Sequence, residues 1–225
     1  MTPAQRHLAK TQAALKGAAP AADRQYANAY ELQLMQLAEH RRTLKRIQSI
    51  ERKIEAKRGM LHVYQPWIQG LLLADRGGQD DVLVTVMLWH LDTGDLAGAW
   101  PMADYVIRHG LSTPDRYERT AATLIAEEVA DTAIKLQDAG TGPDLALLCH
   151  YLTLLASSDM FDQVHAKLHK AVGRAALAAG HKQTAVEHYR RAIELHDKVG
   201  IKKELEVLER EVKKEQAAAG SPDGS

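Results

Sequence analysis

Residues 79–95 read QDDVLVTVMLWHLDTGD and contain the longest apolar run of the chain. Asp80 is a good N-cap residue and Gly94 favours the end of a helix, so the stretch between them predicts one helix. Apolar side chains occupy nearly every side of that helix, which indicates that it is buried. Asp95 is placed to cap a second helix that stops at Gly110, and the short turn requires the two helices to pack antiparallel.

Composition and periodicity extend this prediction to an all-α protein. Leu and Ala dominate, aromatic residues are few, and Pro falls mostly between periodic segments. We expect a long N-terminal coiled-coil-like helix over residues 22–58, ended by Gly59, and then a repeat-like array of antiparallel helical hairpins. Pro143-Asp144 and Asp159 are expected to open two of the later helices. The long helix needs a partner helix, and the sequence leaves open whether the same chain or another subunit supplies it.

The small-residue spacing of the central hairpin recurs near the C-terminal end of the chain. There Ala185, Tyr189 and an earlier Gly173 match part of a tetratricopeptide repeat. The match is incomplete, because His169 and Ala176 occupy the positions of the Trp and Tyr of that repeat. The pattern therefore favours a repeat-like array over a regular solenoid.

Charge is distributed unevenly although the net charge is zero. Residues 1–60 hold 12 Lys/Arg and 5 Asp/Glu, whereas residues 61–225 hold 17 Lys/Arg and 24 Asp/Glu. Such asymmetry indicates that the N-terminal part meets a polyanion. The expected domains are a basic arm and long helix (1–60), the hairpin array (61–200), and a charged helix with a disordered tail (201–225).

The last part of the helix expected over residues 22–58 is strongly basic. Pairs of cations at 41/42, 45/46 and 52/53 fall roughly on one side of a helix, where they can neutralise phosphates and release counterions. A solvated face of a long helix is the alternative interpretation. The predicted DNA-contacting residues are Arg6, Lys10, Lys16, Arg41, Arg42, Lys45, Arg46, Arg52 and Lys53.

No motif in the sequence predicts an active site, a metal or a cofactor. Three pairs of carboxylates invite a nuclease interpretation: Asp80/Asp81, Asp92/Asp95 and Glu127/Glu128. The first two pairs lie where helix caps belong, and the members of the third diverge, whereas a two-metal site needs carboxylates that converge. His165 and His169 have a zinc-compatible spacing but no third ligand, so a surface or capping role is favoured.

Cysteine usage and hydropathy indicate the compartment. Cys149 is the one cysteine, which excludes an internal disulfide and suits a reducing cytosol. No signal peptide or membrane-spanning run is visible in the sequence. We therefore expect an intracellular protein with no membrane partner.

Several short blocks occur in an order and spacing typical of one protein family. They are Pro66-Trp67, TVMLW (85–89), LDTGD (91–95), LAGA (96–99), HGL (109–111), EEVA (127–130), KLHK (167–170) and VGIKKE (199–204). With these blocks the chain resembles the small terminase subunit of temperate tailed phages, the M protein (gpM) family. No single block is a chemical motif, and the resemblance covers most of the chain.

This resemblance implies a role in packaging phage DNA in the host bacterial cytoplasm. The implied partners are phage double-stranded DNA, a large ATPase subunit of the terminase, and further copies of the chain in a homo-oligomeric ring. Members of the family are often labelled the endonuclease subunit, but the residues favour a DNA-recognition and regulatory subunit that is not catalytic by itself. Two alternatives stay open: a subunit that cuts DNA itself, and a tetratricopeptide-like protein–protein adaptor that does not bind DNA.

Overall fold

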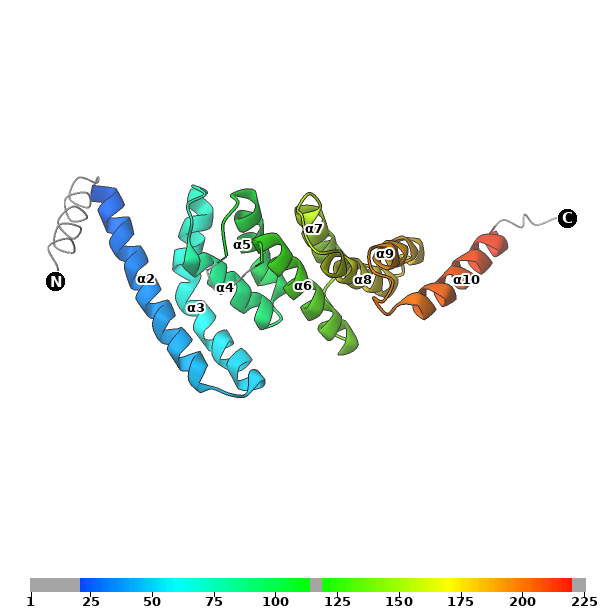
Figure 1. The fold of residues 1–225 in the computed structure, drawn as a ribbon, viewed down its shortest axis with the longest axis horizontal. Helices are drawn as coiled ribbons and strands as arrows, with labels where there is room; N and C mark the ends of the chain where they lie inside the picture. Colours follow the sequence, from blue (N-terminus) through cyan, green and yellow to red (C-terminus); the bar gives the residue numbers. More distant parts are fainter. Residues whose placement is uncertain (1–20, 114–118, 220–225) are drawn as a thin grey trace. The chain divides into compact units, whose positions relative to one another are not determined.

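The computed structural model describes residues 21–113 and 119–219 of the chain (Figure 1). Within these ranges the chain forms helices and no strand, which confirms the all-α prediction. The helices are α2 (Ala21–Arg46), α3 (Ile50–Ala74), α4 (Asp81–Asp92), α5 (Leu96–Arg108), α6 (Ala121–Asp138), α7 (Leu145–Leu155), α8 (Asp162–Ala178), α9 (Lys182–Leu195) and α10 (Lys202–Ala219). None of these described helices is long and apolar enough to cross a bilayer.

The described residues divide into two compact units, one ending at Lys53 and the other beginning at Ile54. In the first unit, α2 has one buried stripe: Leu37 and Leu44 are buried and lie seven residues apart, which is two helical turns. Leu32 and Met35 of the same helix are 64% and 68% exposed. The helix therefore has one covered face and one apolar patch that remains open.

The single helix expected over residues 22–58 is wrong, because the chain is interrupted after Arg46. Residues 47–49 are not helical, and α3 begins at Ile50. The Ser49 hydroxyl accepts a hydrogen bond from the Arg52 backbone N–H at 3.3 Å, as a helix-capping side chain does. A serine that bonds its own neighbouring backbone competes with continued helix, and this ends the run without Gly or Pro.

The predicted end of that helix at Gly59 is also wrong. Gly59 and Pro66 both lie inside α3, which continues to Ala74. The buried side chains of Tyr64 and Ile68 hold this part of α3 in place. Their burial offsets the cost of about 1 kcal/mol that a helical glycine carries relative to alanine.

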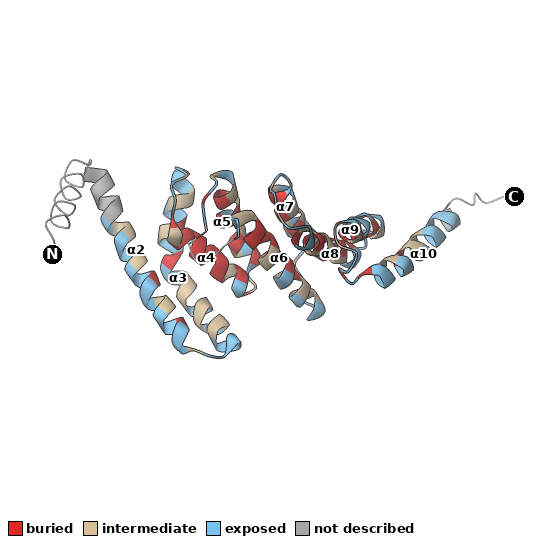
Figure 2. Cartoon of the chain, viewed as in Figure 1, coloured by how far each residue is buried: buried red, intermediate tan, exposed pale blue. Residues whose placement is uncertain are grey.

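The central hairpin forms as the sequence predicts. Helix α4 is buried along almost its whole length, in contrast to α2 and α10 (Figure 2). The Asp80 carboxylate accepts a hydrogen bond from the Leu83 backbone N–H at 2.7 Å, and the Asp95 carboxylate accepts one from Gly98 at 2.8 Å. Both predicted caps are therefore present, and α5 packs against α4.

The later helices of the second unit pack each on one or more of their predecessors. Helix α6 packs on α4 and α5, α7 on α5 and α6, α8 on α6 and α7, α9 on α8, and α10 on α9. Asp144 caps α7 as predicted, but Asp159 does not cap α8, because that helix begins only at Asp162. The coiled-coil character of the N-terminal helix and the repeat-like arrangement of the hairpins remain predictions.

Helices α8 and α9 approach each other closely at a glycine. Gly173 of α8 lies against the ring of Tyr189 of α9, and a Cβ atom added at Gly173 would be 2.5 Å from the ring atom Cδ1. Tyr189 is fully buried. The partial tetratricopeptide match thus identified two residues that are in contact.

Three histidines stack beside this contact and predict a pH-dependent stability. The His169 Nδ1 lies 2.9 Å from the His188 Nδ1, and its ring centroid is 4.8 Å from that of His165. Burial, together with His165, His188 and Arg191, lowers the pKa of His169 from 6.5 to about 3. Between pH 6.5 and pH 3, His169 is therefore protonated in the unfolded chain but remains neutral in the folded chain. The contribution of His169 to the free energy of unfolding is complete above about pH 6.5 and is lost as the pH drops towards 3.

We expect His169→Gln to weaken this acid sensitivity. The measurement is urea unfolding at pH 7.5 and at pH 5, and the wild-type protein should lose more free energy of unfolding than the variant. His62→Gln, at an exposed position of α3, is the control and should lose as much as the wild type. Equal losses in all three proteins would show that the stack does not control the response.

Candidate nucleic-acid interface

The predicted cations that the structure describes gather where α2 ends and α3 begins. Six of the nine predicted DNA-contacting residues lie in residues 41–53, which we call the basic turn. This segment holds six Lys/Arg and one acidic residue, Glu51. The other three predicted residues, Arg6, Lys10 and Lys16, lie outside the described part of the chain.

Most of these side chains are open to solvent. Arg42, Lys45, Arg46 and Arg52 are exposed, whereas Arg41 and Lys53 are half-buried. Arg42 pairs with Glu39 at 3.0 Å, but both side chains are more than half exposed. An exposed pair of this kind contributes at most about 1 kcal/mol, so phosphate can displace it.

The local fold explains why cations gather here, and it corrects the predicted arrangement. Lys45 and Arg46 lie in the last turn of α2, where the partial negative charge of the helix end favours them. Because residues 47–49 interrupt the helix, the pairs 45/46 and 52/53 do not continue one stripe along a single helix. They flank a turn instead.

Two further cations of the basic run have a structural role that the sequence did not reveal. The Lys57 ammonium donates a hydrogen bond to Asp92, and the Arg58 guanidinium donates one to the Thr93 carbonyl at 3.0 Å. Both contacts lie at the C-terminal end of α4, where positive charge is stabilising. Lys57 and Arg58 therefore hold α3 against the central hairpin.

The carboxylate pairs do not assemble a catalytic centre in the described part of the chain. Asp80 and Asp95 are helix caps, and Asp92 pairs with Lys57. No group of three or more His, Cys, Asp or Glu side chains that could hold a metal ion occurs within residues 21–113 and 119–219. The His165–His169 spacing leads to a stacked cluster with His188 and not to a metal site.

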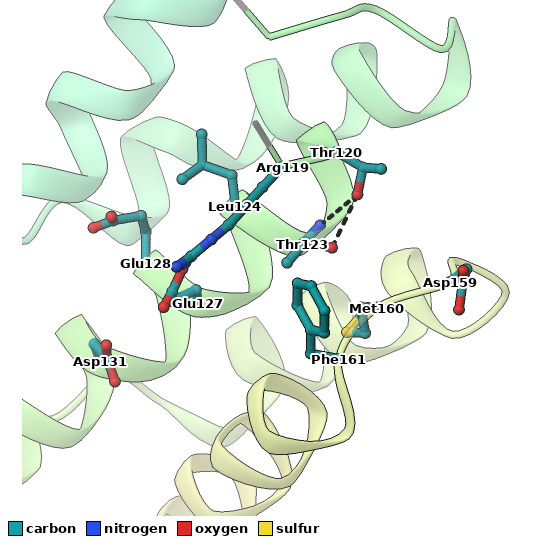
Figure 3. Close-up of a pocket in the computed structure, with 10 residues that line it drawn as sticks. All are labelled: Arg119, Thr120, Thr123, Leu124, Glu127, Glu128, Asp131, Asp159, Met160 and Phe161. Carbon is teal, nitrogen blue, oxygen red and sulfur yellow. Dashed lines mark hydrogen bonds and ion pairs between the residues drawn. The ribbon is translucent and has the colours of Figure 1, made fainter. Parts of the chain in front are cut away.

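A second surface of opposite charge lies in the second unit (Figure 3). It is a groove of about 1060 Å³ between residues 119–131, which include the start of α6, and the segment that precedes α8. We call it the acidic groove, because it has four carboxylates and one cation. Its lining residues are Arg119, Thr120, Thr123, Leu124, Glu127, Glu128, Asp131, Asp159, Met160 and Phe161.

The electrostatics of the acidic groove exclude it as a second phosphate-binding surface. Burial raises the pKa of Glu128, and the neighbouring Asp92 and Asp131 raise it further. Arg119, the one cation of the lining, pairs with Glu127. The negatively charged carboxylates of the groove repel the negatively charged phosphates of a nucleic acid. Of the two surfaces, the basic turn is therefore the one suited to nucleic acid.

Comparison with known proteins agrees with the resemblance seen in the sequence. The family model described as phage small terminase subunit matches residues 34–163, a range that includes both the basic turn and the acidic groove. The chain is 44% identical over 212 residues to the "Terminase, endonuclease subunit" of Escherichia phage P2, which covers 94% of this chain and 86% of that protein. No solved structure matches the chain. The chain belongs to the phage small terminase subunit family.

Proposed function

We propose that this chain is the DNA-recognition and regulatory small subunit of a phage terminase. It binds the packaging-start site on phage double-stranded DNA in the host cytoplasm and recruits the large ATPase–nuclease subunit, which cuts the cohesive ends and packages the genome. The observation that carries this proposal is the set of exposed cations in the basic turn, within the range that the family model matches.

The basic turn suits phosphate contact better than it suits a purely structural role. Its four exposed cations are Arg42, Lys45, Arg46 and Arg52. Lys57 and Arg58, by contrast, are engaged with the end of α4. Each phosphate that a cation neutralises releases counterions, and this release supplies most of the affinity for DNA.

A second candidate function is cleavage of DNA by this subunit itself, which the printed name of the P2 relative favours. The described residues hold no cluster able to bind the metal ions of a two-metal nuclease. We therefore assign the cutting to the large subunit. Incubation of the purified chain alone with Mg²⁺ and packaging-start DNA is expected to leave the DNA intact, and metal-dependent nicking would reverse the assignment.

The proposed assembly contains several copies of the chain, arranged as a homo-oligomeric ring. The open apolar patch of α2, formed by Leu32 and Met35, supports self-association through this helix. Sedimentation of the full chain across a concentration series tests the assembly. A monomer at all concentrations would contradict it.

Charge reversal in the basic turn tests DNA binding. The variant carries Arg42→Glu, Lys45→Glu, Arg46→Glu and Arg52→Glu, and the measurement is fluorescence anisotropy with packaging-start DNA across a salt series. Four lost phosphate contacts should make the log–log salt slope shallower by about 3 to 4, since each contact contributes about 0.9. Affinity at 100 mM salt should fall by at least about 100-fold.

A matched variant separates position from net charge. Lys203→Glu, Arg210→Glu, Lys213→Glu and Lys214→Glu change the net charge by the same amount on exposed positions of α10. This control should keep most of the wild-type affinity and slope. Equal losses in the two variants would show that net charge, and not the basic turn, governs binding.

Shuffled DNA should bind the wild type more weakly than packaging-start DNA. The adaptor alternative predicts that neither DNA binds.

A further inference from the structure

The acidic groove exposes an aromatic side chain among carboxylates. From this combination we infer that the groove docks a short basic segment of the large terminase subunit, with an apolar side chain of that segment against Phe161 and its Lys or Arg side chains over Glu128 and Asp159. This inference rests on the proposed recruitment of the large subunit and names the surface that carries it out.

Phe161 breaks two local rules of stability. It occupies the N-cap position of α8 and supplies no side-chain hydrogen bond there, and its side chain is 65% exposed. The four preceding helices all have Asp or Thr at that position, each with a side chain that accepts a backbone N–H: Asp80, Asp95, Thr120 and Asp144. An exposed phenylalanine in place of a cap is a departure of the kind found at functional sites.

The lining around Phe161 combines apolar surface with four carboxylates, two of which, Glu127 and Asp131, form ion pairs with Arg119 and Lys167. Leu124 and Met160 provide the apolar part, and Figure 3 shows the Phe161 ring beside Met160 on the side of the groove that faces α6. Glu128 is half-buried and forms no ion pair or hydrogen bond with the described residues, although the charges of Lys57 and Arg119 act on it. Asp159 is exposed and forms neither contact with the described residues. A cationic side chain placed here would gain a charge-assisted hydrogen bond and relieve repulsion between neighbouring carboxylates.

Size and chemistry select a peptide among the possible occupants. The groove volume of about 1060 Å³ lies just above the range for small-molecule sites, about 300–1,000 Å³, and suits several residues of an extended segment. Phosphate backbones are repelled by the carboxylates. No metal-binding cluster occurs in the described part of the chain. Aromatic residues, Phe among them, and Met are enriched at protein–protein interfaces.

Phe161→Ser separates binding from stability, because serine is a preferred N-cap residue. In biolayer interferometry with the purified large subunit of the same phage, this variant should bind at least tenfold more weakly than the wild type. Its thermal unfolding midpoint should stay equal or rise, since an exposed phenylalanine is replaced by a cap. Glu128→Lys should weaken binding by a similar factor, and wild-type binding should weaken as salt increases.

Leu73→Ser is the matched control, because Leu73 is 87% exposed and lies on α3 outside the groove. It should bind the large subunit as the wild type does. All variants should keep wild-type affinity for DNA in the anisotropy assay, because the basic turn is unchanged.

Photo-crosslinking identifies the segment that binds in the acidic groove. A benzoylphenylalanine placed at Phe161 should crosslink to a Lys/Arg-rich segment of the large subunit, identified by mass spectrometry. A crosslink to another copy of this chain, or to a neutral or acidic segment, would overturn the inference. Groove variants that bind the large subunit as tightly as the wild type would also overturn it and leave the proposed function intact. Failure of the wild-type protein to bind the large subunit at all would instead remove the recruitment step of the proposed function, and the inference with it.

Discussion

Replacement of Gly173 by alanine is expected to lower the free energy of unfolding by about 2 kcal/mol or more, although alanine is the better helix former. The new Cβ would lie 2.5 Å from Cδ1 and 2.6 Å from Cε1 of Tyr189, well inside van der Waals contact. The ring cannot easily withdraw, because Tyr189 is fully buried and its hydroxyl donates a hydrogen bond to Glu204 at 3.4 Å. Helices α8 and α9 must therefore separate, which opens space in a close-packed core.

A size series and two glycine controls make this prediction specific to the helix contact. Gly173→Val should cost more than Gly173→Ala, about 3 kcal/mol or more, because two further methyl groups enter the same space. Gly59→Ala and Gly70→Ala in α3 should each raise stability by about 0.5–1 kcal/mol, since a Cβ at these positions meets nothing within 4 Å. Urea unfolding measures all four variants. A stabilised Gly173→Ala would show that α8 and α9 adjust without strain.

The parts of the fold that local chemistry determines were predictable from the sequence. Helix α4 combines a nearly all-apolar run with Asp80 at its start and Gly94 after its end, and these signals agree with one another. The interruption at residues 47–49 was not predicted, because it has neither Gly nor Pro. Its one local signal is Ser49, a residue that also occurs within helices. At Gly59 the sequence predicted a helix end that does not occur, because the packing of neighbouring residues outweighs the weak helix preference of glycine.

The candidate sites show the same division between local and long-range information. The positions of the cations near 41–53 follow from the sequence alone, but the engagement of Lys57 and Arg58 depends on residues 35 positions away along the chain. The acidic groove was missed because its two walls come from segments about 30 residues apart. The position of Phe161 was missed for a local reason, because the sequence placed the start of this helix at Asp159, and only the observed start of α8 at Asp162 puts an aromatic residue at the N-cap.

Replacement of Asp80 by alanine should be the most costly change at a helix end, about 2–4 kcal/mol. Asp80 is 1% exposed, and its carboxylate accepts hydrogen bonds from the Leu83 backbone N–H at 2.7 Å and from the Trp67 indole N–H at 3.1 Å. Alanine leaves both donors without this acceptor, and loss of a cap and loss of a buried acceptor each cost about 1–2 kcal/mol. Asp144→Ala is the matched control, since it removes an exposed cap and should cost about 1 kcal/mol.

Two further variants divide the cost between the cap and the indole. Burial raises the pKa of Asp80, so its charged form carries a desolvation cost at neutral pH that asparagine avoids. Asp80→Asn has one oxygen and keeps only one of the two hydrogen bonds, so its loss of stability should fall between those of the wild type and Asp80→Ala. In a Trp67→Phe background the indole donor is absent, and Asp80→Ala should then cost about 1 kcal/mol less than it does in the wild type. If Asp80→Ala costs no more than Asp144→Ala in urea unfolding, the link between α3 and the start of α4 contributes nothing, and the cap alone sets the stability of the central hairpin.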